Sequence, residues 1–266
     1  MKFFVLILCT IWSVAVSAVG DQKVTIITGS SSGLGYELTK LAMQENMRLV
    51  LVDINPEKSQ VIAEQYRNNG GEALVIEADL ADPAQRPQVI DQTIHRFQRI
   101  DYLFNNAGYS YLTTLDDHDM DEAHRLFEVN YWAYVDLAQR ALPHMLRQES
   151  GRIINTSSVL GVIPSSAQLG VYAASKHALM GFFQAVDKEL ADTGVDIKLV
   201  CPGGMKTNIL VNATGKYVDQ VQHLDDDWEL PTKVASEIFT QKDNNELLQF
   251  PSIAKAMREK YLSSLK

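Results

Sequence analysis

Two side chains one helical turn apart could together carry out proton transfer. Tyr172 and Lys176 occur in the stretch VYAASKHA (residues 171–178), and their four-residue spacing places both on one face of a helix. A phenol with a pKa of about 10 is a poor base, and moving that pKa to about 7 requires about 4 kcal/mol of preference for the phenolate. A neighbouring ammonium group can supply a large part of this preference. The alternative is a surface Tyr and Lys at accidental helical spacing.

A second candidate for chemistry is the stretch TGSSSGLG at residues 28–35. Its glycines are spaced G-x-x-x-G-x-G, which differs from the dinucleotide fingerprint G-x-G-x-x-G. A β-branched run precedes it and predicts a strand over 24–28, whereas apolar residues three and four apart predict a helix from Leu34 onward. Such a turn points unpaired N–H groups and the positive end of the helix dipole into the loop, which suits a pyrophosphate. A plain flexible loop is the alternative.

The elements around these residues predict one α/β domain with a doubly wound parallel sheet of the Rossmann type. Apolar strands are expected at 24–28, 48–53, 72–77, 100–104, 152–155 and 197–200, with helical stripes between them. In such sheets, ligands bind beyond the carboxyl ends of the strands. The residues that follow the strands are the glycine turn, Asp53, Asp79-Leu80, Asn105-Asn106-Ala107-Gly108, Thr156-Ser157-Ser158 and Pro202-Gly203-Gly204. Their gathering at one edge of the sheet predicts a binding site there.

Composition excludes one class of partner. The formal net charge is −9 over 266 residues, and no block of Lys and Arg occurs. Because neutralising phosphates requires a basic face, nucleic acid is not expected as a partner. The histidines show no paired helical spacing, so no metal is expected either. Acidic residues at 116–122 could suggest a cation site, but they are better explained by capping and by the dipole of a helix that begins there.

The first residues differ from the rest of the chain. An apolar run over 3–16 is followed by Val16-Ser17-Ala18, so residues 1–18 are expected to be a secretory signal peptide or, alternatively, an N-terminal membrane anchor. This predicts the secretory pathway, with the cytoplasm as the alternative and a core strand or helix as a further one. Removal of Cys9 would leave Cys201 without an internal disulfide partner. Asn212-Ala213-Thr214 is a glycosylation sequon that matters only in that pathway.

The motifs occur in an order typical of a known family. They are Thr28-Gly29-x-x-x-Gly33-x-Gly35, Asn105-Asn106-Ala107-Gly108, Asn130, Ser158, Tyr172-x-x-x-Lys176 and Pro202-Gly203. From about Lys23 to Thr207 the sequence therefore resembles the short-chain dehydrogenases/reductases, whose own glycine spacing the turn matches. The resemblance implies a domain over 19–266 that binds a nicotinamide cofactor in the glycine turn, with a variable substrate flap near 208–227.

The resemblance also implies roles for individual residues. Tyr172 would exchange a proton with the substrate oxygen, Ser158 would orient that oxygen, Lys176 would assist Tyr172 and hold the nicotinamide ribose, and Asn130 would hold a water in a proton relay. The implied cofactor-binding residues are Gly29, Ser31, Ser32, Gly33, Leu34, Gly35, Asp53, Asp79, Leu80, Asn106, Ala107, Gly108, Tyr172, Lys176, Pro202, Gly203 and Thr207. One departure is a loop before Tyr172 that is one residue longer than usual, so the choice of Ser158 over Ser157 rests on the alignment of SSVLG, and the substrate mouth is expected to be reshaped.

Two further expectations concern the ligands. Asp53 ends the second strand, where a carboxylate can accept hydrogen bonds from the adenosine ribose, so NAD is expected in preference to NADP; a turn cap is the alternative for Asp53. The expected substrate is a hydrophobic alcohol or carbonyl compound, such as a steroid, a retinoid or a lipid-derived carbonyl, in a pocket lined by Tyr109, Leu160, Val162, Gln168, Met205, Ile209 and Leu210.

Competing functions are a non-catalytic protein that binds nicotinamide nucleotides and a secreted binding protein that reuses the fold without a cofactor. Neither needs Tyr172, Lys176, Ser158 and Asn130 together, so an oxidoreductase is preferred. The family resemblance further implies a homodimer or homotetramer.

Overall fold

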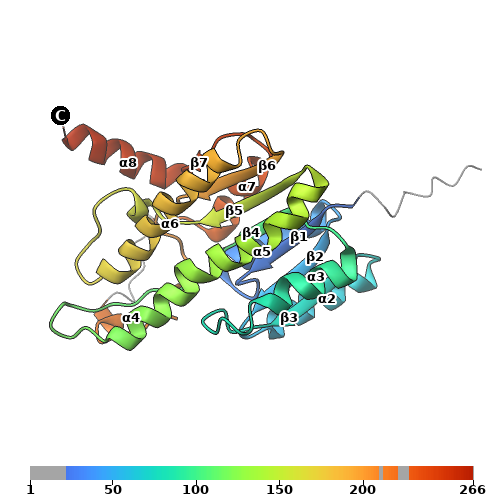
Figure 1. The fold of residues 1–266 in the computed structure, drawn as a ribbon. Helices are drawn as coiled ribbons and strands as arrows, with labels where there is room; N and C mark the ends of the chain where they lie inside the picture. The colour runs from blue at the N-terminus through green and yellow to red at the C-terminus, as the bar shows by residue number, and fades with distance from the viewer. Residues whose placement is uncertain (1–21, 210–211, 221–227, 266) are drawn as a thin grey trace, which may run out of the picture.

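The structure is a computed structural model that describes residues 22–209, 212–220 and 228–265. Within these residues, seven strands form one all-parallel sheet in the order β3-β2-β1-β4-β5-β6-β7 (Figure 1). The strands are β1 (Val24–Thr28), β2 (Arg48–Asp53), β3 (Ala73–Glu77), β4 (Tyr102–Asn105), β5 (Gly151–Thr156), β6 (Val195–Val200) and β7 (Leu248–Gln249). The sheet confirms the predicted doubly wound Rossmann-type fold.

Helices cover both faces of this sheet. They are α1 (Gly33–Gln44), α2 (Glu57–Asn68), α3 (Pro87–Phe97), α4 (Met120–Phe127), α5 (Ala133–Gln148), α6 (Gly170–Glu189), α7 (Pro231–Thr240) and α8 (Ser252–Ser264). Apolar side chains of α3, α5 and α6 pack on one face, and those of α1, α2 and α7 pack on the other. Because both faces are covered, every residue of β1 is buried, and each large apolar side chain so buried contributes about 1.5–3 kcal/mol.

The register of the sheet brings the predicted polar residues to one edge. Thr28 pairs with Val52, and Thr156 pairs with Val200. Since the strands are parallel, the residues that follow these positions emerge side by side at the carboxyl edge. The glycine turn therefore lies beside Asp53, as the sequence predicts.

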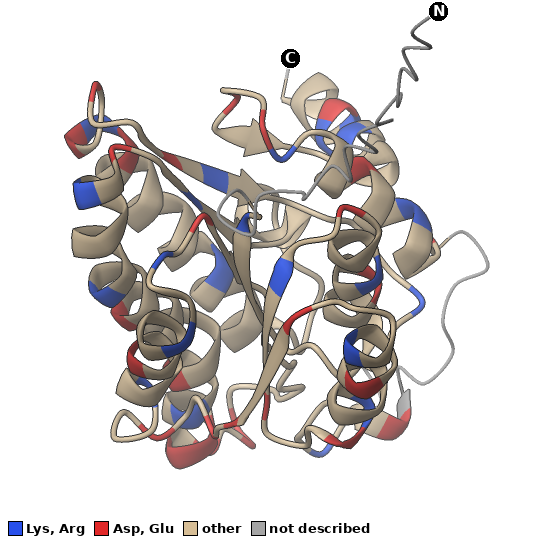
Figure 2. Ribbon diagram, turned by 90° about the vertical axis from the view of Figure 1, so that its right-hand side faces the viewer, with Lys and Arg blue, Asp and Glu red and all other residues tan. Residues whose placement is uncertain are grey.

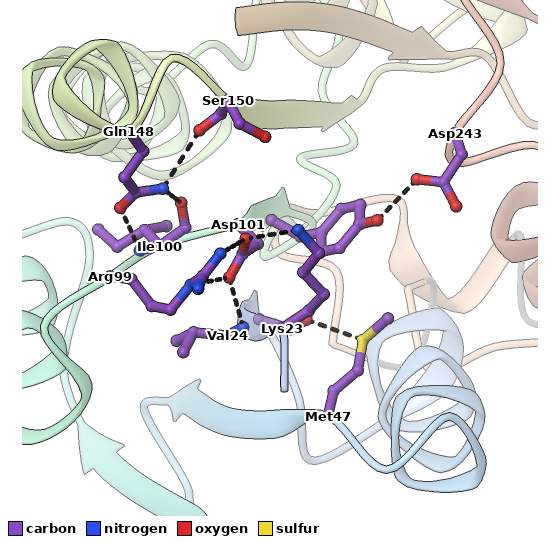
Figure 3. Close-up of polar contacts among 11 residues, drawn as sticks. Lys23, Val24, Met47, Arg99, Ile100, Asp101, Gln148, Ser150 and Asp243 are labelled. Carbon is purple, nitrogen blue, oxygen red and sulfur yellow. Dashed lines mark hydrogen bonds and ion pairs between the residues drawn. The ribbon is translucent and has the colours of Figure 1, made fainter. Parts of the chain in front are cut away.

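The amino edge of the sheet is fastened by a buried carboxylate. Asp101 Oδ2 accepts hydrogen bonds from the main-chain N–H of Val24 at 2.8 Å and from Nε of Arg99 at 2.8 Å, and its Oδ1 faces Lys23 Nζ at 3.2 Å (Figure 3). Burial alone would raise the pKa of Asp101, but the hydrogen bonds from Arg99 and Val24 outweigh burial and hold that pKa below its usual value. This cluster ties the start of β1 to the start of β4, at the end of the sheet opposite the predicted site.

Acidic and basic residues are interspersed along the helices that cover the sheet (Figure 2). The expected signal peptide or anchor, at residues 1–18, lies outside the described residues, as do Leu210 and residues 221–227 of the expected flap. In the part of the chain that the structure describes, no helix is long and apolar enough to span a membrane.

Candidate active site

The glycine turn joins β1 to α1 and leaves the first turn of that helix open. Gly29 and Gly33 have φ angles of +67° and +52°, in the left-handed region that favours glycine. A Cβ on Gly35 would lie 2.1 Å from the carbonyl oxygen of Gly29, so only glycine fits there. Ser32, at the N-cap of α1, makes no side-chain capping bond to that first turn. The turn thus offers unpaired N–H groups and a close backbone approach, which suits a dinucleotide phosphate.

The loop after β4 is held directly against this turn. Thr28 Oγ1 accepts hydrogen bonds from the main-chain N–H groups of Asn106 at 2.8 Å and Ala107 at 3.0 Å. The side chain of Asn106 donates in return to the carbonyl of Thr28 at 3.0 Å. On the other side, a Cβ on Gly33 would touch the side chain of Thr207 at 3.2 Å. Residues that follow three different strands therefore meet around the turn.

Asp53 is committed to two main-chain donors. Its Oδ2 accepts from the N–H of Ser31 at 2.9 Å, and its Oδ1 accepts from the N–H of Asn55 at 3.0 Å. The second bond is the turn cap that the sequence left as an alternative, and the first fastens the glycine turn to β2. Asp53 is partly exposed, so its carboxylate keeps a face open to a ligand.

The pair after β3 lies further from the glycine turn. Leu80 is buried, and Asp79 Oδ2 accepts from Arg125 Nη2 of α4 at 2.9 Å. That ion pair raises the pKa of Arg125. Asp79 therefore links the end of β3 to α4.

Tyr172 and Lys176 lie on α6 and are both buried, at 8% and 3% exposure. Burial raises the pKa of Tyr172 to about 12, although a hydrogen bond with Ser158 acts in the opposite direction. The sequence led us to expect that Lys176 lowers this pKa, but desolvation dominates among the protein's own groups. The phenol is therefore protonated at neutral pH in the folded chain.

The side chain of Lys176 contacts the end of β5. Its Nζ donates to the carbonyl of Thr156 at 2.9 Å and lies 5.3 Å from the ring centroid of Tyr134 and 5.7 Å from that of Tyr172. Burial lowers the pKa of Lys176 to about 7. The ammonium and neutral amine are thus close in free energy near neutral pH, which suits a group that assists proton transfer.

The two serines after β5 are separated by their contacts. Ser157 Oγ donates to the carbonyl of Lys176 at 3.1 Å, so this side chain fastens α6 to the end of β5. Ser158 instead forms the hydrogen bond that acts on Tyr172, and its Oγ also accepts from the N–H of Leu160 at 3.2 Å. The contacts favour Ser158 over Ser157 as the partner of Tyr172.

Asn130 lies in a π-helical turn, Glu128–Trp132, between α4 and α5. Its Oδ1 accepts from the N–H of Tyr109 at 3.1 Å, and its Nδ2 donates to the carbonyl of Tyr109 at 2.9 Å. A Cβ on Gly108 would lie 3.0 Å from Asn130 Oδ1 and 3.7 Å from Lys176 Nζ. Asn130 therefore clamps the loop after β4 next to Lys176.

A cavity of about 600 Å³ joins these residues. The predicted site residues that line it are Gly29, Ser32, Gly33, Leu34, Asn106, Ala107, Gly108, Ser158, Tyr172, Lys176, Pro202, Gly203 and Thr207. The predicted residues outside its lining are Ser31, Gly35, Asp53, Asp79, Leu80 and Asn130. Ser31, Gly35 and Asp53 belong to the glycine turn or contact it. Asp79 and Leu80 follow β3, and Asn130 holds the loop beside Lys176.

The residues expected to line a substrate pocket lie in the cavity wall only in part. Leu160, Met205 and Ile209 line the cavity, whereas Tyr109, Val162 and Gln168 do not. The main chain of Tyr109 is held by Asn130, Val162 packs against the hydrophobic core, and the carbonyl of Gln168 accepts from Thr113 at 3.0 Å. These three residues are therefore not part of the cavity wall to which the sequence pattern assigned them.

Sequence reasoning missed several residues of the site. They are Ser110, Ser166, Leu169, Trp228, Ile253 and Met257 in the cavity wall, and Tyr134 beneath Lys176. The hydroxyl of Tyr134 donates to the carbonyl of Ala107 at 3.0 Å. Its position on α5, four residues after Asn130 and thus one helical turn away, is the only local signal that could have indicated it. Within the described residues, no three His, Cys, Asp or Glu side chains gather as a metal site would require.

The parallel sheet, the open glycine turn and the Tyr172, Lys176 and Ser158 group define a Rossmann-type protein with a nucleotide-binding turn. A family described as short chain dehydrogenase matches residues 23–217. Human Dehydrogenase/reductase SDR family member 7 is 34% identical over 197 residues, covering 72% of this chain and 58% of that protein. The chain thus spans less than two thirds of this relative's length.

Solved structures agree with this match. A short-chain dehydrogenase/reductase from Burkholderia phymatum in complex with NAD superposes with a TM-score of 0.82 at 25% identity, covering 93% of this chain and 96% of that one. A short-chain dehydrogenase from Burkholderia cenocepacia in complex with NADP gives a TM-score of 0.74 at 26% identity, covering 86% and 95%. The chain belongs to the short-chain dehydrogenase/reductase family.

Proposed function

We propose that the chain is an oxidoreductase that interconverts an alcohol and a ketone or aldehyde, with NAD(H) preferred to NADP(H) and Tyr172 as the general acid/base. The observation that carries the proposal is the placement of Tyr172, Ser158 and Lys176 on the same cavity as the glycine turn. A protein that only bound the nucleotide would have no use for a buried phenol with a hydroxyl partner and a buried amine in that cavity.

The turn residues fit a nicotinamide cofactor because a side chain at Gly29 or Gly35 would collide with backbone or with Asn106. The residues that would hold it are the glycine turn, Asp53, Asp79 and Leu80, residues 106–108, Lys176, and Pro202, Gly203 and Thr207. When bound, a nicotinamide cofactor supplies or accepts the hydride.

The proton is the task of the protein's own residues. Tyr172 is protonated at neutral pH, so its hydroxyl can donate to the oxygen of a carbonyl substrate and recover the proton in the reverse direction. Ser158 hydrogen-bonds Tyr172 and can orient the same oxygen. The amine of Lys176, with a pKa of about 7, can accept or donate a proton near neutral pH.

The substrate we propose is a hydrophobic alcohol or carbonyl compound, such as a steroid, a retinoid or a lipid-derived carbonyl. Support comes from the apolar residues that line the same cavity as Tyr172, which include Leu160, Leu169, Met205, Ile209, Trp228 and Met257. Apolar surface of this kind favours binding of an apolar skeleton, while the few polar groups orient the reacting oxygen.

Two proposals concern the setting of the enzyme. Residues 1–18 are proposed to direct the chain to the secretory pathway, either as a cleaved signal peptide or as a membrane anchor. N-terminal sequencing and carbonate extraction test this, and a soluble cytoplasmic product that retains Met1 would contradict it. A homodimer or homotetramer is proposed from the family and is tested by light scattering.

The experiment for the reaction is a panel of alcohols and ketones followed by NADH absorbance, with each cofactor and with Tyr172→Phe as the control protein. Turnover of an apolar alcohol or ketone that depends on Tyr172 supports the proposal. Binding of NADH without turnover of any substrate would favour the non-catalytic alternative.

A further inference from the structure

One wall of the cavity is fastened to the loop after β4. This wall, which we call the post-β6 wall, comprises residues 208–209 and 212–217, and its cavity-lining members are Asn208, Ile209 and Asn212. The N–H of Thr214 donates to the carbonyl of Ser110 at 2.9 Å, and the N–H of Leu112 donates to the carbonyl of Thr214 at 2.9 Å. The main chain of the wall is therefore attached two residues beyond its last contact with the cavity.

A side-chain contact strengthens this attachment. Thr214 Oγ1 donates to Glu122 Oε1 at 2.6 Å, a short hydrogen bond to a carboxylate. Such charge-assisted bonds are about twice as strong as neutral ones. Glu122 is itself fixed, because it lies in the first turn of α4, where the Asp119 carboxylate caps the N–H groups of Asp121 and Glu122. The capping expected at residues 116–122 is thereby confirmed.

The residues that follow α4 also hold the loop after β4, next to Lys176. Asn130, which follows α4 in the chain, clamps Tyr109 through both atoms of its amide. Burial and the Glu122 carboxylate raise the pKa of Tyr109. Glu122 thus connects the post-β6 wall to α4, and the main chain of Thr214 connects the same wall to the loop after β4.

The wall also contacts Asp117, and this contact is weaker than the bond between Thr214 and Glu122. Lys216 Nζ and the hydroxyl of Tyr217 both donate to Asp117, at 2.8 Å and 2.9 Å. The Lys216 side chain is 67% exposed, so water and salt screen this ion pair. The bond between Thr214 and Glu122 is the one expected to control the position of the wall.

We propose that Glu122 is a positioning residue that holds the post-β6 wall through Thr214 and so sets which substrates fit opposite Tyr172. The proposal rests on the proposed oxidoreductase function for its substrate readout. Thr214 is also the last residue of the sequon that begins at Asn212, and a role in glycosylation alone would make its hydroxyl dispensable in protein from a host that does not glycosylate.

The first test compares Thr214→Val, which keeps the shape and loses the hydroxyl, with Thr214→Ser, which keeps the hydroxyl. In protein from a non-glycosylating host, Val should raise KM for the apolar substrate about ten-fold, with kcat within about two-fold and NADH binding unchanged. The KM of Thr214→Ser should stay close to that of the unmodified protein. Glu122→Ala should raise KM about as much as Thr214→Val does. The double variant Glu122→Ala, Thr214→Val should have a KM close to that of either single variant, because both substitutions remove the same bond. Lys216→Met is the control at the exposed ion pair.

The second test does not need turnover. Trypsin can cleave after Lys206, which precedes the wall, and after Lys216, which lies within it. Cleavage should be several-fold faster in Thr214→Val than in Thr214→Ser, because Val loses the side-chain bond to Glu122 and keeps only the main-chain bonds to Ser110 and Leu112. Equal cleavage of the two variants would overturn the fastening. Faster cleavage with unchanged KM would overturn the effect on substrate selection. An absence of turnover in the unmodified protein would instead refute the proposed function, while the cleavage result still decides the fastening.

Discussion

The amine of Lys176 donates a hydrogen bond of 2.9 Å to the carbonyl of Thr156, inside a site where Lys176 is only 3% exposed. One neutral acceptor does not replace the water that an ammonium group loses on burial. Burial therefore lowers the pKa of Lys176 to about 7, and the folded chain carries a destabilising charge below that pH. The proposed role of Lys176 in proton transfer therefore comes at a cost in stability.

We predict that Lys176→Met is more stable than the unmodified protein at pH 6. The folded-state pKa lies below the usual value of about 10.4 for lysine, so the unfolded chain binds more protons between the two values and stability rises with pH there. The substitution removes the free-energy cost of burying the ammonium and also removes the hydrogen bond to Thr156. The net increase in the free energy of unfolding is about 1–3 kcal/mol near pH 6. The gain should shrink as the pH approaches 10.

Urea unfolding of both proteins at pH 6, 8 and 10 measures this difference. Lys188→Met, at an exposed position of the same helix, is the matched control and should show no such gain. A loss of stability in Lys176→Met that is the same at all three pH values would show that burial does not penalise the ammonium.

Tyr172→Phe should lower kcat about 100-fold or more and leave NADH binding nearly unchanged. The substitution removes only the hydroxyl that would exchange a proton with the substrate oxygen, and positioned proton transfer contributes about 10²–10⁴-fold. Steady-state kinetics and an NADH fluorescence titration separate the two effects. Retained turnover would remove Tyr172 from the mechanism.

Asp101→Asn should destabilise the fold by about 1–3 kcal/mol at pH 7 without changing kcat, because Asp101 fastens β1 to β4 at the end of the sheet opposite the cavity. The pKa of Asp101 is lowered in the folded chain, so its contribution is complete above the usual aspartate pKa of about 3.9 and is lost as the pH falls through the lower folded value.

The stability gap between Asp101→Asn and the unmodified protein should therefore be constant from pH 5 to 7 and narrow below about pH 4. Thermal unfolding over this range is the measurement, with Asp91→Asn at an exposed position of α3 as the control. A gap that persists unchanged at pH 2.5 would show that the carboxylate charge is not what stabilises the amino edge.

The sequence predicted strands well because strands buried on both faces appear as continuous β-branched runs. The expected ranges 24–28 and 48–53 agree with β1 and β2 at both ends, and the next four are within about two residues. β7 was not expected, because two residues give no periodicity. Asn106 and Ser158 were found because each follows a strand, and the parallel register then brings the strand ends together. Tyr172 and Lys176 were found from their helical spacing, and Asn130 from the family resemblance.

The rest of the site depends on distant parts of the chain. Ile253 and Met257 reach the cavity because α8 follows β7, which pairs with β6, and Trp228 reaches it because its neighbour Glu229 bridges to Met205. No local pattern indicates these contacts. The same holds for electrostatics. The helical spacing of Tyr172 and Lys176 suggested an ammonium that lowers the phenol pKa, but burial of both groups in the fold decides the outcome.

Asp53 provides the last prediction, which concerns cofactor choice. At about 4 Å and an effective dielectric of 20, its carboxylate would repel one charge of a 2′-phosphate by about 4 kcal/mol. Tenfold corresponds to about 1.4 kcal/mol, so we expect kcat/KM with NAD(H) to exceed that with NADP(H) at least ten-fold. Because the carboxylate also accepts from Ser31 and Asn55, its charge and its hydrogen bonds must be tested separately.

Asp53→Asn removes the charge and keeps one acceptor, so it should lose the preference for NAD(H) mainly through a higher kcat/KM with NADP(H). Asp53→Ala should lose it as well, but with poorer use of NAD(H), since the glycine turn is no longer fastened to β2. Kinetics with both cofactors distinguish these outcomes, and equal use of NAD(H) and NADP(H) by the unmodified protein would mean that Asp53 serves only as the cap of its turn.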